Sequence, residues 1–265
     1  MLRLLKPLSA IVTLAALGLL AASCGTNGPT IRVVNALSNT GSPYIPLDVY
    51  VNLAKINSTS LGFGGVYPNQ PPSGPVQYAG VTSGSDPIAV FDTGDPTTDT
   101  TVLGVNSSGA GTAVNETFSS GSLYTLVLAG SVDNLTNPPI VLSFTDDNTL
   151  PPTGFVEFRV VDASIWLKGQ YPQGLDVYFE TGNIGGTPQI SALTYQSIGP
   201  GYVQVPFNSG NPQITVYVTP HGDQNLHLIT YSSTQNNEQI NTLVIYDTPS
   251  GTGYSGTLLQ FTDEN

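Results

Sequence analysis

Few side chains of this sequence can do chemistry. Its 265 residues include one Cys, two His and 18 Asp or Glu residues. Both histidines lie in one short segment, His221-Gly-Asp-Gln-Asn-Leu-His227, with Asp223 between them. Two His and one Asp can bind zinc, but the Gly-Asp and Asn residues of this segment are typical of a turn. We therefore interpret the segment as an exposed turn, and we predict neither a metal nor a cofactor.

The sequence lacks most of the residue patterns that catalysis requires. A serine nucleophile needs a His base beside it, and both histidines belong to that one segment. The sequence contains no Gly-x-Ser-x-Gly elbow and no Gly-x-x-x-x-Gly-Lys phosphate loop. Two acids could still form a glycosidase site, which no sequence spacing excludes. We predict a protein that is not an enzyme, with a carboxylate-dependent glycan hydrolase as the alternative.

The charge of the chain excludes one class of partner. Six Lys and Arg residues against 18 Asp and Glu residues give a formal net charge of -12. Affinity for nucleic acid comes mainly from Lys and Arg side chains that neutralise phosphates. We therefore expect no nucleic-acid partner, and we expect a surface built largely from uncharged polar residues, because only 9% of the residues are charged.

Acidic residues follow a phenylalanine in two similar segments, Phe144-Thr-Asp-Asp-Asn148 and Phe261-Thr-Asp-Glu-Asn265. Carboxylates of this kind can bind Ca²⁺, but neither segment has the Asp-x-Asp-x-Asp-Gly spacing of an EF-hand loop. We expect Phe144 and Phe261 to lie in a hydrophobic core and the acids to lie in solvated loops.

The only cysteine lies directly after an N-terminal apolar run. Arg3 and Lys6 precede Ile11-Val-Thr-Leu-Ala-Ala-Leu-Gly-Leu-Leu20, which is too short for a comfortable transmembrane helix. Small residues then lead to Cys24, a pattern that resembles the bacterial lipoprotein signal, in which the cysteine is acylated. This resemblance implies a signal peptide over residues 1–23, a lipidated tether over 24–29 and an exported protein anchored to a membrane. An ordinary secretory signal with a chance cysteine is the alternative.

The remainder of the chain is a tandem repeat. Matching segments occur twice in the same order: Ile31-Arg-Val-Val-Asn-Ala36 with Phe158-Arg-Val-Val-Asp-Ala163, Tyr78-Ala-Gly-Val81 with Tyr202-Val-Gln-Val205, Thr125-Leu-Val-Leu128 with Thr242-Leu-Val-Ile245, and the two segments that contain Phe144 and Phe261. A short Pro-rich linker separates the copies. The sequence therefore predicts two domains, over residues 30–149 and 154–265.

Each copy has the pattern of an antiparallel β-sandwich. Apolar and polar residues alternate in Leu47-Asp-Val-Tyr-Val51 and in Leu175-Asp-Val-Tyr-Phe179, turn residues separate such segments, and no stretch has a convincing helical period. The repeated Arg-Val-Val and Leu-Asp-Val-Tyr motifs resemble the domain-of-unknown-function 4397 family of exported bacterial proteins. That resemblance covers nearly all of the exported chain and implies tandem immunoglobulin-like domains, but no activity.

Two cations recur at equivalent positions, Arg32 and Arg159, and each copy also repeats an acid, Asp48 or Asp176. Side chains alternate between the two faces of a strand, so Arg32 lies on the opposite face from Ile31 and Val33. If the two signature strands of a copy are neighbours, Arg32 can meet Asp48, and Arg159 can meet Asp176, as cross-strand pairs. We expect these pairs to be structural, and to contribute about 0.2–1 kcal/mol if they are exposed.

These observations favour a non-catalytic binding, adhesion or assembly role in the cell envelope, either in the periplasm or on the cell surface. An envelope glycan or a protein is the expected partner, besides the membrane that acylated Cys24 would enter. Trp166 and Tyr171 lie between the two signature segments of the second copy and are the candidate ligand-binding residues. A subunit that assembles into a surface layer or filament through exposed sheet edges is a further alternative.

Overall fold

The computed structural model describes residues 28–38, 46–70, 76–92, 101–105, 111–112, 114–132, 136–182, 184–250 and 253–264. Their secondary structure is almost entirely β-strand, which confirms the predicted all-β class. The signal peptide and Cys24 lie outside these residues. Within the described part of the chain, no helix is both long and apolar enough to cross a membrane.

The first repeat folds into two sheets. Its inner sheet has the order β11-β10-β1-β4, with β5 beside β1, and consists of β1 (Thr30–Asn35), β4 (Val66–Tyr67), β5 (Ala79–Gly80), β10 (Leu123–Ala129) and β11 (Ile140–Asp146). Its outer sheet has the order β3-β2-β6-β7-β8, with β9 beside β6, and consists of β2 (Leu47–Val51), β3 (Ala54–Lys55), β6 (Gly84–Asp92), β7 (Thr101–Val105), β8 (Gly111–Thr112) and β9 (Val114–Phe118).

The second repeat has the same plan. Its inner sheet has the order β15-β12-β19-β20, with β16 beside β12, and consists of β12 (Phe155–Asp162), β15 (Ser197–Ile198), β16 (Val203–Pro206), β19 (Ile240–Ser250) and β20 (Gly253–Glu264). Its outer sheet has the order β14-β13-β17-β18 and consists of β13 (Leu175–Glu180), β14 (Ile190–Leu193), β17 (Gln213–Pro220) and β18 (Ile229–Thr234).

Two features differ from the sequence-based expectation. In each inner sheet one pair of strands is parallel, namely β1 with β10 and β12 with β19. A short helix, α1 (Ile165–Gln170), follows β12 in the second repeat. The helix was not expected because six residues are fewer than two helical turns and leave almost no periodic signal.

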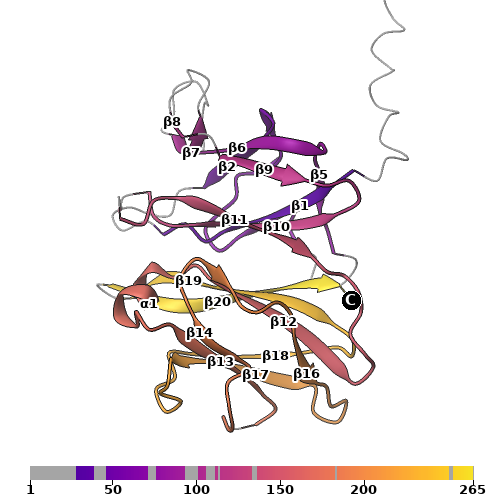
Figure 1. The fold of residues 1–265 in the computed structure, drawn as a ribbon, viewed down its shortest axis with the longest axis vertical. Coiled ribbons are helices and arrows are strands. Elements are labelled where there is room, and N and C mark those ends of the chain that lie inside the picture. Colours follow the sequence, from indigo (N-terminus) through magenta and orange to yellow (C-terminus); the bar gives the residue numbers. More distant parts are fainter. Residues whose placement is uncertain are drawn as a thin grey trace, which may run out of the picture.

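The four sheets stack in layers, with the two inner sheets facing each other (Figure 1). Alternation along the strands explains the stacking. In β1, Ile31 and Val33 enter the core of their own repeat, whereas Val34 faces the other repeat. In β12, Val160 enters the core of the second repeat, whereas Val161 faces the first repeat. Each inner sheet is therefore apolar on both faces, and the second face buries itself against its counterpart.

A cluster of four charges lies inside this interface. Arg32 of β1 donates to Asp146 of its own repeat at 3.3 Å and to Asp263 of the other repeat. Arg159 of β12 donates to Asp146 at 2.5 Å and lies 3.6 Å from Asp263. All four side chains are at most 3% exposed. The two arginines and two aspartates thus neutralise one another across the boundary between the repeats.

The surroundings of the two arginines are related by approximate two-fold symmetry. Each guanidinium donates to a threonine hydroxyl of its own repeat and to a backbone carbonyl of the other. Each also lies over two aromatic rings, one from each repeat. The residues that supply these contacts are Thr125, Tyr78, Phe261 and the Thr262 carbonyl for Arg32, and Thr242, Tyr202, Phe144 and the Thr145 carbonyl for Arg159.

Electrostatics favour the charged form of Arg32 and the neutral form of the two phenols beside the cluster. Burial alone would lower the pKa of the Arg32 guanidinium, but Asp263 and Asp146 outweigh that effect and raise it. Burial raises the pKa of Tyr78 and of Tyr202, so both phenols stay protonated. Each phenol donates to one aspartate of the cluster, at 2.8 Å.

The predicted Arg32–Asp48 and Arg159–Asp176 pairs are wrong. Arg32 lies in an inner sheet and Asp48 in an outer sheet, so the core of the first repeat separates them. Asp48 instead forms an ion pair with Lys55 at 2.7 Å. The same separation applies to Arg159 and Asp176, because β12 and β13 belong to different sheets.

The acids that follow Phe144 and Phe261 also differ from expectation. The first acid of each segment, Asp146 or Asp263, is buried and paired with arginine rather than solvated. Phe261 is buried as expected, but it packs in the interface between the repeats. Phe144 packs against the same interface and is only partly buried.

We predict that Asp263→Asn lowers the free energy of unfolding by about 3–5 kcal/mol, because it leaves a buried guanidinium without its compensating charge. Urea denaturation of the full chain would measure this change. Asp223 is exposed, so Asp223→Asn should stay within about 0.5 kcal/mol of the unmodified chain. A similar small loss for Asp263→Asn would contradict the inferred dependence of the interface on this cluster.

Candidate functional site

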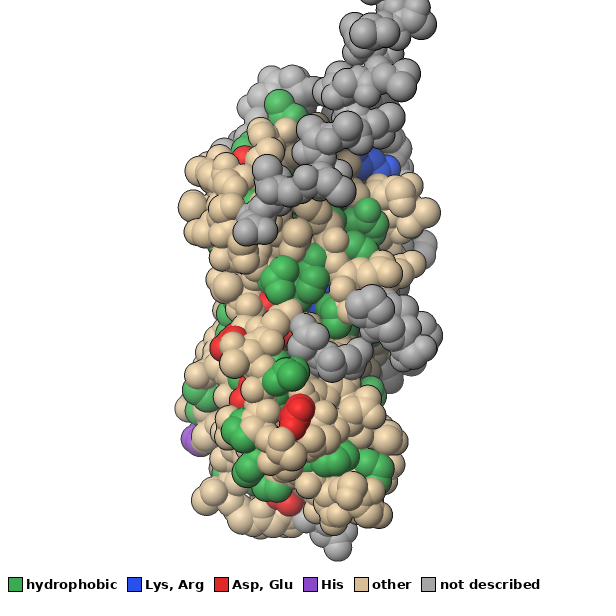
Figure 2. Space-filling view, turned by 90° about the vertical axis from the view of Figure 1, so that its right-hand side faces the viewer, with side chains coloured by type: hydrophobic (Ala, Val, Ile, Leu, Met, Phe, Trp, Pro, Cys, Tyr) green, Lys and Arg blue, Asp and Glu red, His purple; other side chains and the backbone are tan. Residues whose placement is uncertain are grey.

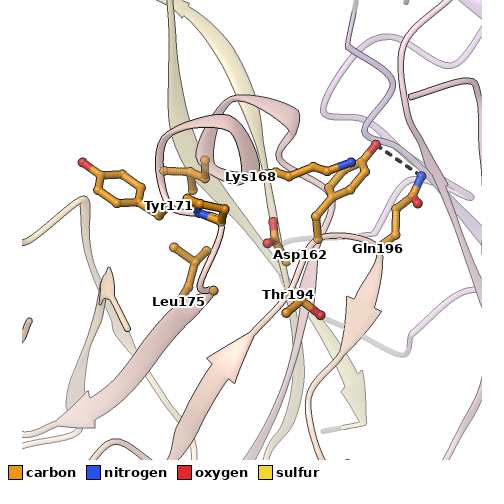
Figure 3. Close-up of a pocket in the computed structure, with 10 residues that line it drawn as sticks. Asp162, Lys168, Tyr171, Leu175, Thr194 and Gln196 are labelled. Atoms are coloured by element: carbon orange, nitrogen blue, oxygen red, sulfur yellow. Dashed lines mark hydrogen bonds between the residues drawn. The ribbon is translucent and has the colours of Figure 1, made fainter. Parts of the chain in front are cut away.

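A pocket of about 220 Å³ lies beside α1 in the second repeat (Figure 3). Two stretches of chain form its walls. One is α1 with the turn into β13, and the other is the turn between β14 and β15. The lining residues are Asp162, Leu167, Lys168, Tyr171, Pro172, Gly174, Leu175, Thr194, Tyr195 and Gln196.

Local hydrogen bonds fix α1 against the inner sheet. The hydroxyl of Ser164 caps the helix by accepting from the N–H of Leu167 at 3.0 Å. Asp247 of β19 accepts from the hydroxyl of Ser164 and from the N–H groups of Ile165 and Trp166. The first turn of α1 is therefore tied to β19, which holds the start of this wall in place.

A glycine brings the two walls together. Gly174 has φ +97°, and a Cβ atom there would lie 2.9 Å from the backbone of Ala192 and Leu193. Real Cβ atoms do not come this close to backbone atoms. The turn after α1 can thus approach the end of β14 only with glycine at this position.

Asp162, at the end of β12, is the buried polar group of the pocket. Its side chain is 2% exposed, and its Oδ1 accepts from the N–H of Ser164 at 2.9 Å. Burial raises the pKa of Asp162 to about 7; the Ser164 N–H opposes this rise, and the nearby Asp247 carboxylate adds to it. Burial also raises the pKa of Asp247. The pocket therefore contains a carboxyl group that changes charge near neutral pH.

Lys168 lies on the other side of Asp162 from Thr194 (Figure 3). Its ammonium is 4.7 Å from the ring centroid of Tyr195 and donates to Asn137 of the first repeat at 2.5 Å. The hydroxyl of Tyr195 accepts from Nε2 of Gln196 at 3.2 Å. The pocket thus combines acceptors and donors, and one of its walls is anchored to the other repeat.

The structure places the two predicted ligand residues differently. Trp166 is the second residue of α1, packs against the core of the second repeat and does not line the pocket. Tyr171 follows α1 and lines the pocket, but its ring points away from Asp162 (Figure 3). Their role in ligand binding stays a prediction.

The other polar lining residues were not predicted from the sequence; they are Asp162, Lys168, Thr194, Tyr195 and Gln196. One signal was available, because the matched Arg-Val-Val segments differ at one informative position, where Asn35 stands in the first copy and Asp162 in the second.

A Ser, a His and an Asp do meet on the outer sheet of the second repeat. Oδ1 of Asp176 accepts from the hydroxyl of Ser191 at 3.0 Å and lies 2.9 Å from Nδ1 of His221. The Ser191 hydroxyl is 3.4 Å from that same nitrogen. A catalytic triad uses both ring nitrogens, one toward the acid and the other toward the serine. The arrangement instead closes a turn, in which Asp176 also accepts from the N–H of Gly222.

The histidine segment is exposed, as predicted, although His221 has a carboxylate partner and His227 packs against Tyr217. No three His, Cys, Asp or Glu side chains in the described ranges are placed to share a metal ion. Figure 2 shows one face of the molecule, on which acidic side chains are scattered among uncharged polar side chains and backbone.

We predict that Asp162→Asn stabilises the chain at pH 8 by roughly 1–3 kcal/mol and changes little at pH 4. The native carboxyl keeps its proton up to about pH 7, whereas the unfolded carboxyl loses it near pH 4. The free energy of unfolding therefore falls between these values, and asparagine removes this cost. Urea denaturation at several pH values measures it, and an equal effect of the substitution at pH 4 and pH 8 would refute the shifted pKa.

Comparisons with known proteins give only distant likenesses. No family model matches the sequence, and a search of the curated proteins found no match, so the family resemblance stays a prediction. Among solved structures, a streptococcal virulence factor that binds α-glucan is similar at 10% identity and TM-score 0.24, over 80% of this chain and 92% of its own. A candidate cell adhesion protein from Bacteroides fragilis is similar at 12% identity and TM-score 0.20, over 89% and 97%. TM-scores of this size carry no argument about function.

Proposed function

We propose that this protein is an exported, lipid-anchored bacterial protein that binds a ligand without catalysis, and that the pocket of the second repeat is its binding site. The observation that carries the proposal is a preformed concave site with a buried carboxyl, a lysine and a tyrosine. Ligand sites are typically such cavities, in which a few placed polar groups interrupt an apolar wall. Leu167, Leu175 and Pro172 supply that apolar wall here.

Binding fits the geometry better than hydrolysis does. A glycosidase needs two carboxyl groups on opposite sides of the scissile bond. Among the described residues, Asp162 is the only acid that lines the pocket. Asp247 lies nearby, but hydrogen bonds from the start of α1 already occupy its carboxylate. The site therefore offers one titratable acid and no second carboxylate to act as nucleophile or base.

The anchor and the first repeat complete the proposal. Acylation of Cys24 would hold the chain at a membrane, because several acyl chains on one cysteine give firm attachment. The first repeat then acts as a spacer, and the charge cluster of the interface fixes the second repeat relative to it. A fixed orientation presents the pocket at a set distance from the membrane.

We predict that Cys24→Ser abolishes incorporation of labelled palmitate and releases the protein from the membrane fraction. The reason is that no other cysteine can carry the acyl chains. Expression in a bacterial host, followed by fractionation and labelling, measures both effects. Unchanged membrane association in the serine variant would rule out the lipid anchor.

Ligand binding is tested by screening the full chain against an array of glycans and cell-envelope components. We expect at least one reproducible hit that Tyr195→Ala weakens at least tenfold, because the substitution removes a wall of the pocket. Tyr217→Ala, on the outer sheet of the same repeat, is the matched control and should leave that hit unchanged. Hits that are equally insensitive to both variants would place the binding site elsewhere, and cleavage of a bound glycan would overturn the non-catalytic role.

A further inference from the structure

We infer that the pocket beside α1 takes a neutral ligand with neighbouring hydroxyl groups, of the size of a single sugar ring or cyclic polyol. The inference rests on the proposed binding function and specifies its ligand class. Its basis is a comparison of equivalent positions in the two repeats, where the same backbone carries different side chains.

The first difference is Asn35 against Asp162. In both residues Oδ1 accepts from the N–H two positions later in the chain. In the first repeat, Nδ2 of Asn35 also donates to the carbonyl of Leu61 at 3.1 Å, so its side chain is satisfied internally. Above about pH 7 the side chain of Asp162 is a carboxylate and has no such donor. Among the described residues, only the N–H of Ser164 donates to the Asp162 side chain, so Oδ2 is available to a donor that enters the pocket.

The second difference is Gly64 against Gln196. Both residues donate their N–H to the carbonyl of the residue just compared, Asn35 or Asp162. Both also have a positive φ, +66° for Gly64 and +58° for Gln196. Glycine adopts this conformation freely, whereas a residue with a side chain is strained by about 1 kcal/mol or more. The second repeat therefore has a strained glutamine, which lines the pocket, at the position where the first repeat has an unstrained glycine.

The charges of the lining favour a neutral ligand. Asp162, with Asp247 close behind it, disfavours an anion, and the ammonium of Lys168 in the same wall disfavours a cation. The hydroxyl of Thr194 donates to Ser197, so a ligand hydroxyl group can donate to Asp162 or Thr194 and accept from Lys168. A ligand with several neighbouring hydroxyl groups can therefore contact the acceptors and the donor of the pocket at the same time. A ligand with only donors or only acceptors cannot do so.

The size of the pocket sets the scale of the ligand. Its volume of about 220 Å³ exceeds the roughly 150 Å³ of a cavity that holds one benzene molecule. A six-membered ring with polar substituents thus fits, whereas a longer chain of sugars would have to extend out of the pocket.

Calorimetric titration of the full chain tests the ligand class. The probes are glucose, galactose, mannose, N-acetylglucosamine and myo-inositol, with choline as a small cation and glucuronate as an anion. We expect binding of at least one neutral probe and none of choline or glucuronate. Asp162→Asn and Gln196→Gly should each weaken that binding at least tenfold. Both variants should fold, because they install the residues that the first repeat carries at these positions.

Glu180→Gln is the control, since it removes one negative charge from the outer sheet of the same repeat. It should leave binding unchanged. Tight binding of choline alone would overturn the ligand class and leave the proposed function standing. Neutral-probe binding that survives both pocket variants would overturn the site. If no probe binds while the array gives a hit that depends on Tyr195, this inference fails alone; if the array is also blank, the proposed function fails with it.

Discussion

The placement of the two repeats depends on the cluster of Arg32, Arg159, Asp146 and Asp263. Removing each of these charges from water costs several kcal/mol, and only a complete set of partners compensates that cost. Each aspartate lies within 4 Å of both arginines, so a shift between the repeats would unpair two charges at once. The apolar surface around the cluster gives most of the attraction, and the cluster selects one arrangement of the sheets.

The geometry of the pocket also depends on this interface. Lys168 in its wall donates to Asn137 of the first repeat, and the side chain of Ser38 of the first repeat lies close enough to Asp247, which holds the start of α1, to oppose the rise of its pKa. Both contacts exist only while the inner sheets face each other. The second repeat therefore presents its pocket in a geometry that the first repeat helps to hold, although none of the described residues of the first repeat lines the pocket.

The sequence predicts the class of fold but not the partners across the interface. Alternation correctly puts Arg32 on the face opposite Ile31 and Val33. That face was expected to carry a cross-strand pair within the repeat, because one repeat alone gives no sign that a second sheet covers it. The segments that hold Asp146 and Asp263 were recognised as repeats, yet their link to the arginines needs the parallel pairing of β1 with β10, which brings distant segments together.

The same limit applies to the pocket, and the comparison of the repeats shows how to overcome it. Aromatic residues such as Trp166 are obvious candidates for ligand binding in a sequence, but Trp166 packs against the core of the second repeat. Residues that recur in both copies, such as the arginines, hold the two repeats together. Residues that differ between the copies at equivalent backbone positions need another explanation. Asp162 carries the cost of a buried carboxyl and Gln196 the cost of a positive φ, whereas Asn35 and Gly64 carry neither cost at the equivalent positions of the first repeat. A cost carried in one copy only is expected where a ligand offsets it.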